Sequence, residues 1–265
     1  MTTSARVPVA LTIAGSDSGG GAGIQADLKT FHRFGVYGTS AITAITAQNT
    51  LGVMRWDPVD PTLVRAQIDA VAADLRPAAT KSGMLGDIPV VEAVARAIRD
   101  HGLAPYVLDP VMVATSGDAL ARDEAVDVIR DRLVPLATLV TPNLDEAARL
   151  TGAVVRDVPQ MRAAAAALVT QLGAQAALVK GGHLDGDVVC DILYADGALH
   201  EFVRPRVATT STHGTGCTLS SAITAQLALG TPLLVAVRDA LEFVHAAIRT
   251  APGLGGGHGP LNHWA

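Results

Sequence analysis

The sequence predicts an α/β fold with a central, mostly parallel sheet, helices on both faces and some antiparallel edge strands. Short apolar segments alternate with amphipathic helical segments along most of the chain, and each apolar segment ends at glycine, proline or a polar residue. Strands that are apolar throughout are typical of a parallel sheet covered on both faces. Of the 265 residues 49% are hydrophobic and 17% charged, and no linker or repeat interrupts them. We therefore expect a single domain over residues 1–265.

The elements are expected in the following order. Residues 9–13 form the first strand and run into a glycine-rich turn. Three helices are then indicated by apolar residues at helical spacing, namely Ile24, Leu28 and Phe31; Val64, Ile68, Val71 and Leu75; and Val90, Val94 and Ile98. Short strands are expected at 106–108, 138–140 and 177–179. Segments 188–194 and 199–203 flank an Asp-Gly turn signal, which predicts an antiparallel hairpin at the sheet.

Polar residues follow several of the expected parallel strands directly. Gly15, Asp109, Asn143 and Lys180 each stand just past an apolar segment. Because ligands of open α/β sheets bind at the carboxyl ends of the strands, these residues are expected to converge on one edge of the sheet.

Composition excludes several classes of protein. The formal charge of −5 and the absence of a basic run argue against a nucleic-acid partner. No segment approaches the roughly 20 uninterrupted apolar residues of a membrane span, and residues 1–7 lack a targeting pattern, so we expect a soluble cytoplasmic protein without a membrane partner. The only cysteines, Cys190 and Cys217, give neither a disulfide framework nor a zinc-ligand spacing.

The most informative segment is HGTGCT at residues 213–218, where a glycine-rich turn precedes an Ala- and Leu-rich helix. Free backbone N–H groups and the helix dipole at such a junction favour an anion, and Gly214 and Gly216 allow a phosphate to approach. Cys217 stands where a helix end favours a thiolate, which would supply an acid/base group. A tight turn that caps a helix around a buried thiol is an equally good interpretation of this segment.

Three other motifs also have two interpretations. The glycine-rich turn at 15–23 fits a small-molecule pocket or a flexible turn, but not a Walker-type phosphate loop. Asn143 and Glu146 match a capping box, although they also place an amide and a carboxylate on one helix face. Lys180, one of only three lysines, suits a phosphate contact or a side chain that reaches past the sheet edge to water.

Taken together, the motifs resemble the ribokinase-like superfamily and, within it, the hydroxymethylpyrimidine/phosphomethylpyrimidine kinases of thiamine biosynthesis. The resemblance covers nearly the whole chain. It rests on LTIAGSD at 11–17, GGAGIQADLKTF at 20–31, TAQNT at 46–50, LDPVM at 108–112, TPN at 141–143, KGGH at 180–183 and HGTGCT at 213–218.

The resemblance implies an ATP- and Mg²⁺-dependent kinase that phosphorylates 4-amino-5-hydroxymethyl-2-methylpyrimidine to its monophosphate and then to the pyrophosphate. It implies Cys217 as the catalytic group, where many superfamily members have an aspartate. It places Asp109 and Glu146 near the metal. The implied pyrimidine pocket comprises Gly15, Asp27, Gln48, Met84 and Val111, with Gln48 pairing with the ring edge. The implied nucleotide and phosphate contacts are Asn143, Lys180, Gly214, Thr215 and Gly216.

Two other functions are compatible with these residues. Some relatives with the same glycine-rich start accept pyridoxal, so a pyridoxal kinase of vitamin B6 salvage is the alternative. A sensor that binds the pyrimidine without turnover is disfavoured by the anion-binding turn together with Cys217 and Lys180. A homodimer is expected from relatives only.

Overall fold

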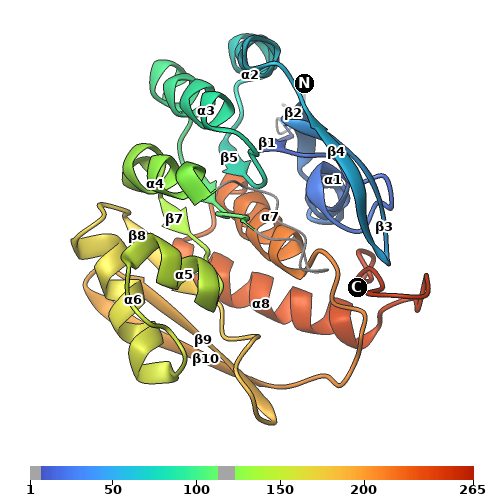
Figure 1. The fold of residues 1–265 in the computed structure, drawn as a ribbon, viewed down its shortest axis with the longest axis vertical. Helices are drawn as coiled ribbons and strands as arrows, with labels where there is room; N and C mark the ends of the chain where they lie inside the picture. The colour runs from blue at the N-terminus through green and yellow to red at the C-terminus, as the bar shows by residue number, and fades with distance from the viewer. Residues whose placement is uncertain (1–6, 113–122) are drawn as a thin grey trace, which may run out of the picture.

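The computed structural model describes residues 7–112 and 123–265. Its centre is an eight-stranded sheet in the order β10-β9-β8-β7-β6-β5-β1-β2 (Figure 1). Strands β1, β2, β5, β6, β7 and β8 run parallel, and β9 pairs antiparallel with both β8 and β10. The bounds are β1 Val9–Ala14, β2 Tyr37–Ile42, β5 Ala79–Ser82, β6 Tyr106–Leu108, β7 Leu139–Val140, β8 Ala176–Val179, β9 Val188–Ala195 and β10 Ala198–Pro205. The predicted fold class is confirmed.

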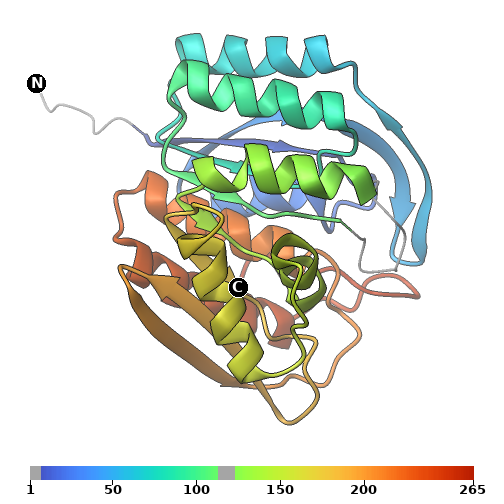
Figure 2. The ribbon, with the colours of Figure 1, turned by 60° about the vertical axis from the view of Figure 1, so that its left-hand side comes forward.

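Helices cover both faces of the sheet (Figures 1 and 2). One face packs against α2 Pro61–Asp74, α3 Ile88–His101, α4 Asp123–Arg132, α5 Leu144–Thr151 and α6 Val158–Thr170. The other packs against α1 Gly23–Arg33, α7 Thr215–Ala228 and α8 Leu233–Arg249. A short 3-10 turn spans Val134–Leu136. None of the helices in the described ranges is long and apolar enough to cross a membrane.

The helices lie where the apolar spacing predicts them. Along α3, for example, Val90, Val94 and Ile98 are buried on one side, and Gly102 ends the helix in the left-handed conformation. The hairpin is confirmed as well: Asp196 and Gly197 both have positive φ (52° and 76°), as a two-residue type I′ turn requires.

A second, two-stranded sheet was not expected from the sequence. It consists of β3 Ala44–Asn49 and β4 Gly52–Pro58, which pair with each other outside the main sheet (Figure 1). Ile45 and Met54 are exposed while the small residues Ala44 and Thr46 are buried, so the segment lacks the continuous apolar run that marks the buried parallel strands. The carboxy-terminal segment packs on the turn of this hairpin, where the N–H of His258 donates to the carbonyl oxygen of Thr50 at 2.8 Å.

Candidate active site

A cavity of about 570 Å³ lies at the carboxyl ends of the parallel strands. The prediction that Gly15, Asp109, Asn143 and Lys180 meet at one edge of the sheet is confirmed, because all four line this cavity. Most of the other expected site residues line it too: Gln48, Met84, Val111, Glu146, Gly214, Thr215, Gly216 and Cys217. The structure therefore brings these residues together at one cavity, whereas their roles stay predictions.

The glycine-rich turn at 15–23 is held in shape by Asp17. The carboxylate of Asp17 accepts hydrogen bonds from the backbone N–H groups of Gly19, Gly21 and Ala22 at 2.8, 3.0 and 2.8 Å. Burial alone would raise the pKa of Asp17, but these bonds and the contact with His213 at 2.9 Å outweigh burial and lower it. The turn is therefore an ordered wall of the cavity, rather than a flexible loop.

The segment 213–217 forms the opposing wall and opens α7. Gly214 is the N-cap residue and has φ 78°, so the chain enters the helix through a left-handed residue. A Cβ at Gly214 would lie 1.9 Å from the carbonyl oxygen of Gly21. The two glycine-rich segments are thus in direct backbone contact, with the free N–H groups of the first turn of α7 at the cavity.

Charged groups gather where β6, β7 and β8 end. Nζ of Lys180 donates to Oδ1 of Asp109 at 3.0 Å and lies 3.9 Å from Oε2 of Glu146. Burial alone would lower the pKa of Lys180, but the two carboxylates outweigh it and raise the pKa. Burial raises the pKa of Glu146 to about 7, and Lys180 limits this increase. The lysine is therefore a fixed positive charge at the cavity.

Both interpretations of the pair Asn143 and Glu146 find support in the structure. The Asn143 side chain accepts from the N–H of Glu146 at 2.9 Å, and the Glu146 carboxylate accepts from the N–H of Asn143 at 2.7 Å. This reciprocal pair is a capping box at the start of α5. The same carboxylate lines the cavity beside Lys180, so the cap holds it at the site.

The environment of Cys217 differs from the sequence expectation. Position at a helix end was expected to favour the thiolate, but burial raises the pKa of the thiol to about 11. The positive charge of Lys81 lowers this pKa, whereas the negative charges of Asp27 and Asp109 raise it. The thiol is consequently protonated near neutral pH.

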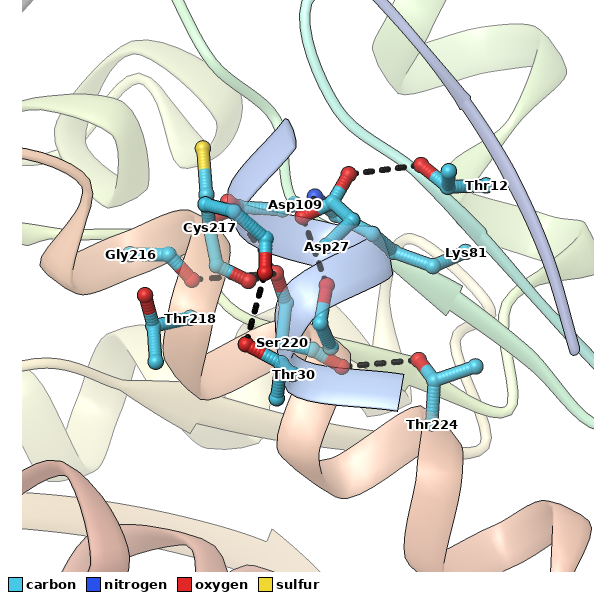
Figure 3. Close-up of polar contacts among 12 residues, drawn as sticks. Thr12, Asp27, Thr30, Lys81, Asp109, Gly216, Cys217, Thr218, Ser220 and Thr224 are labelled. Carbon is cyan, nitrogen blue, oxygen red and sulfur yellow. Dashed lines mark hydrogen bonds and ion pairs between the residues drawn. The ribbon is translucent and has the colours of Figure 1, made fainter. Parts of the chain in front are cut away.

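Asp27 is the one expected pocket residue that lies outside the cavity. Its side chain is fully buried, and its carboxylate accepts hydrogen bonds from Thr12, Lys81 and Ser221, each at 2.6 Å (Figure 3). Four elements, α1, β1, β5 and α7, therefore meet at one carboxylate. The expectation that Asp27 lines the pyrimidine pocket does not match this structure, because Lys81 and Ser221 bond Oδ1 and Thr12 bonds Oδ2 in the interior.

Sequence reasoning missed two sets of residues. The first is Lys81, which is fully buried in the short strand β5; its segment, ATKS, is too polar to be recognised as a buried strand from the sequence. The second is an apolar wall at the far end of the cavity, formed by Val189, Pro205, Leu241, Val244 and Ile248. Nothing marked this wall in the sequence, because its residues come from the hairpin and from α8 and have ordinary apolar spacing.

The oxygen ligands at the site are suited to magnesium. Asp109 and Glu146 supply two carboxylates, and among residues 7–112 and 123–265 no cluster of three or more His, Cys, Asp or Glu could hold a metal by itself. Mg²⁺ typically binds one or two carboxylates, keeps several waters and binds substrate phosphates. Two carboxylates beside an anion-binding turn therefore fit this ion.

The comparisons with known proteins agree with the geometry. Residues 17–262 match the family model described as phosphomethylpyrimidine kinase. A hydroxymethylpyrimidine/phosphomethylpyrimidine kinase of Rhizobium meliloti is 52% identical, covering 97% of each chain. Its counterpart in Bacillus subtilis is 48% identical over 97% of this chain and 94% of that protein.

Solved structures give the same result. A phosphomethylpyrimidine kinase from Clostridium difficile has 41% identity and a TM-score of 0.81, covering 91% of this chain and 99% of that one. A Bacillus subtilis pyridoxal kinase in an ADP complex has 39% identity and a TM-score of 0.90, covering 97% of both chains. A fold and a sequence that agree at this level lead to one conclusion: the chain belongs to the phosphomethylpyrimidine kinase family.

Proposed function

We propose that this protein phosphorylates 4-amino-5-hydroxymethyl-2-methylpyrimidine with ATP and then phosphorylates the monophosphate to the pyrophosphate. The observation that carries the proposal is one cavity that joins a small polar pocket to an apolar slot through the amino terminus of α7. A kinase needs these three parts, since phosphoryl transfer depends on positioning and on stabilisation of charge.

The end of the cavity beside the glycine-rich turn combines polar and apolar side chains that suit a substituted ring. Met84 and Val111 provide apolar contacts, and the amide of Gln48 can both donate and accept at an amino-pyrimidine edge. Nε2 of Gln48 lies 3.5 Å from Nε2 of His213, which itself contacts Asp17. These neighbours hold the amide at the cavity, where it can select the ring.

The apolar slot suits the base of ATP. Val189, Pro205 and Ile248 line it, and the loop after β8 closes one side. Arg206 stabilises that loop, because its guanidinium donates to the carbonyl oxygens of Gly182 at 2.9 Å and Gly186 at 2.8 Å and also to that of Leu184. A nucleotide in this slot would direct its phosphates toward Lys180 and the first turn of α7.

The transfer forms a bond between the hydroxymethyl oxygen and the γ-phosphorus while the bond to the β,γ-bridging oxygen breaks and ADP leaves. Gly214, Thr215 and Gly216 would stabilise charge on the transferring group through backbone N–H groups. Asp109 and Glu146 would hold Mg²⁺, which neutralises phosphate charge when bound. Cys217 would orient the hydroxymethyl group and, as a thiolate, accept its proton. Because burial raises the pKa of Cys217 to about 11, turnover of the alcohol should increase with pH in the alkaline range.

An ADP-release assay tests the proposal with three acceptors in turn: the pyrimidine alcohol, its monophosphate and pyridoxal. We expect turnover of the first two, and loss of most alcohol turnover in Cys217→Ala with less effect on the monophosphate, which has no alcohol proton to lose. Absence of ADP release with both pyrimidines would refute the assignment. Faster turnover of pyridoxal would favour the alternative, which the 39% identical pyridoxal kinase structure supports. The homodimer expected from relatives stays a prediction.

A further inference from the structure

The buried Asp27–Lys81 ion pair lies one helical turn from Cys217. Helices α1 and α7 lie side by side, with Ser221 donating to Asp27 at 2.6 Å and the backbone N–H of Gly23 bonded to the sulfur of Cys217. Residues four apart share a helix face, so the contact of Gly23 with Cys217 stands directly above the contact of Asp27 with Ser221. Figure 3 shows Lys81 reaching from the sheet to Asp27 in the same network.

The pair cannot be explained as ordinary surface charge. Both side chains are fully buried, and a buried ion pair seldom stabilises a fold more than apolar residues of the same size. Burial alone would lower the pKa of Lys81, but Asp27, Cys217 and Asp109 outweigh it and raise the pKa, so the ammonium is retained. A retained charge in this position acts on the neighbouring thiol.

We infer that Lys81 and Asp27 are positioning residues that set the reactivity of Cys217, with Lys81 favouring the thiolate and Asp27 opposing it. The charged groups that face Cys217 come from four elements: Asp27 on α1, Lys81 on β5, Asp109 after β6 and Lys180 after β8. Among them only Asp27 and Lys81 lie outside the cavity lining, so a change there alters the charge without removing a residue from the cavity. The consequence for catalysis rests on the proposed function; the consequence for the thiol does not.

The test measures how fast iodoacetamide alkylates Cys217 between pH 7 and pH 11. Cys190 is the only other cysteine, so Cys190→Ser gives a background with one thiol. In that background Asp27→Asn should increase the alkylation rate at pH 9, and Lys81→Met should decrease it, each on the order of tenfold. Thr12→Val is the matched control, because it removes a 2.6 Å hydrogen bond to Asp27 without changing a charge.

The opposite changes in alkylation rate expected for Asp27→Asn and Lys81→Met distinguish an electrostatic role from a purely structural one. Disrupted packing would shift both variants the same way, and that result, or no shift in either, would overturn the inference. If Lys81→Met does not fold, Lys81→Gln replaces it, because it also removes the positive charge and should also slow alkylation relative to the parent. An unchanged or faster rate in Lys81→Gln would overturn the inference.

Kinetics then connect the thiol to catalysis. The pH profile of turnover with the pyrimidine alcohol should move in parallel with the alkylation profile, while KM for ATP stays constant. If alkylation shifts as expected but no variant, including the parent, phosphorylates the alcohol, then the proposed function fails and the electrostatic role of the pair stands. If turnover is normal and alkylation does not respond, the pair has no such role.

Discussion

Lys180, which is partly exposed, and Lys81, which is fully buried, show how position decides the role of one residue type. Lys180 lines the cavity and pairs with Asp109, whereas Lys81 lies in the interior and pairs with Asp27. Both have raised pKa values because carboxylates outweigh the effect of burial. The carboxylates around each ammonium keep it charged, against the opposing effect of burial.

Gln48 provides a prediction at this scale. Replacement by leucine leaves the polar edge of the pyrimidine without a partner, which should weaken binding by roughly 1–3 kcal/mol, or about 5- to 150-fold in Kd. The measurement is KM for the pyrimidine alcohol with ATP held saturating. Gln175→Leu is the control, since Gln175 is exposed and precedes β8 at the opposite end of the strand. A KM equal to that of the parent would remove Gln48 from ring recognition.

The capping box of α5 is both a structural element and part of the site. Glutamine also serves at the third position of a capping box, so Glu146→Gln should preserve the cap while it removes the negative charge. We expect lower turnover with little change in melting temperature. Glu146→Ala should lose turnover and, in addition, about 1 kcal/mol of stability. Asp157→Ala removes the cap of α6, outside the cavity, and should cost stability alone. Full activity of Glu146→Gln at saturating Mg²⁺ would leave capping as the only role of Glu146.

The pH dependence of stability gives an independent measurement for the same element. Burial raises the pKa of Glu146 to about 7 from 4.5, so the folded state binds its proton more tightly than the unfolded chain does. The stability contributed by this proton is fully present below pH 4.5 and is lost as pH rises through 7. Chemical denaturation at pH 4.5 and at pH 7.5 measures this effect. Between these two pH values the free energy of unfolding should fall more in the parent than in Glu146→Gln.

Two glycines with similar left-handed backbone conformations allow the effect of backbone strain to be distinguished from the effect of a close contact between segments. Gly214 (φ 78°) has its Cβ position 1.9 Å from the carbonyl oxygen of Gly21, whereas Gly230 (φ 81°) faces open space. Gly230→Ala should cost about 1–2 kcal/mol through left-handed strain and leave turnover intact. Gly214→Ala should also separate the two glycine-rich segments and abolish turnover. Comparable activity of the two variants would show that this contact is not required.

The two ends of the cavity are formed by different parts of the fold. The pyrimidine end comes from β1, the small β3–β4 sheet and the residues after β5, and the apolar end comes from the hairpin and α8. Ile248→Ser should therefore raise KM for ATP without changing KM for the pyrimidine. Leu234→Ser, an exposed position on the same helix, is the control. A rise in KM for the pyrimidine alone would reverse the assignment of the two ends.

The sequence by itself determined the fold class, three of the helices, the hairpin and the edge of the sheet where the site lies, but it did not reveal the strands β2 and β5. These features depend on local spacing: apolar period, turn residues and the polar residue after each strand. Asp109, Asn143 and Lys180 were therefore placed correctly, and the motifs identified the family. The small β3–β4 sheet was not predicted because β3 buries the small residues Ala44 and Thr46 and exposes Ile45, so its burial does not follow the apolar residues.

Only the tertiary structure decided which charged side chains meet. Asp27 and Lys81 are 54 residues apart in sequence, and their pairing removes Asp27 from the pocket in which the family resemblance had placed it. The pKa of Cys217 likewise depends on burial and on charges from other elements, so its helix position alone gave the wrong direction. Electrostatic interactions depend on distances between charges in space, and these distances are set only when the chain has folded.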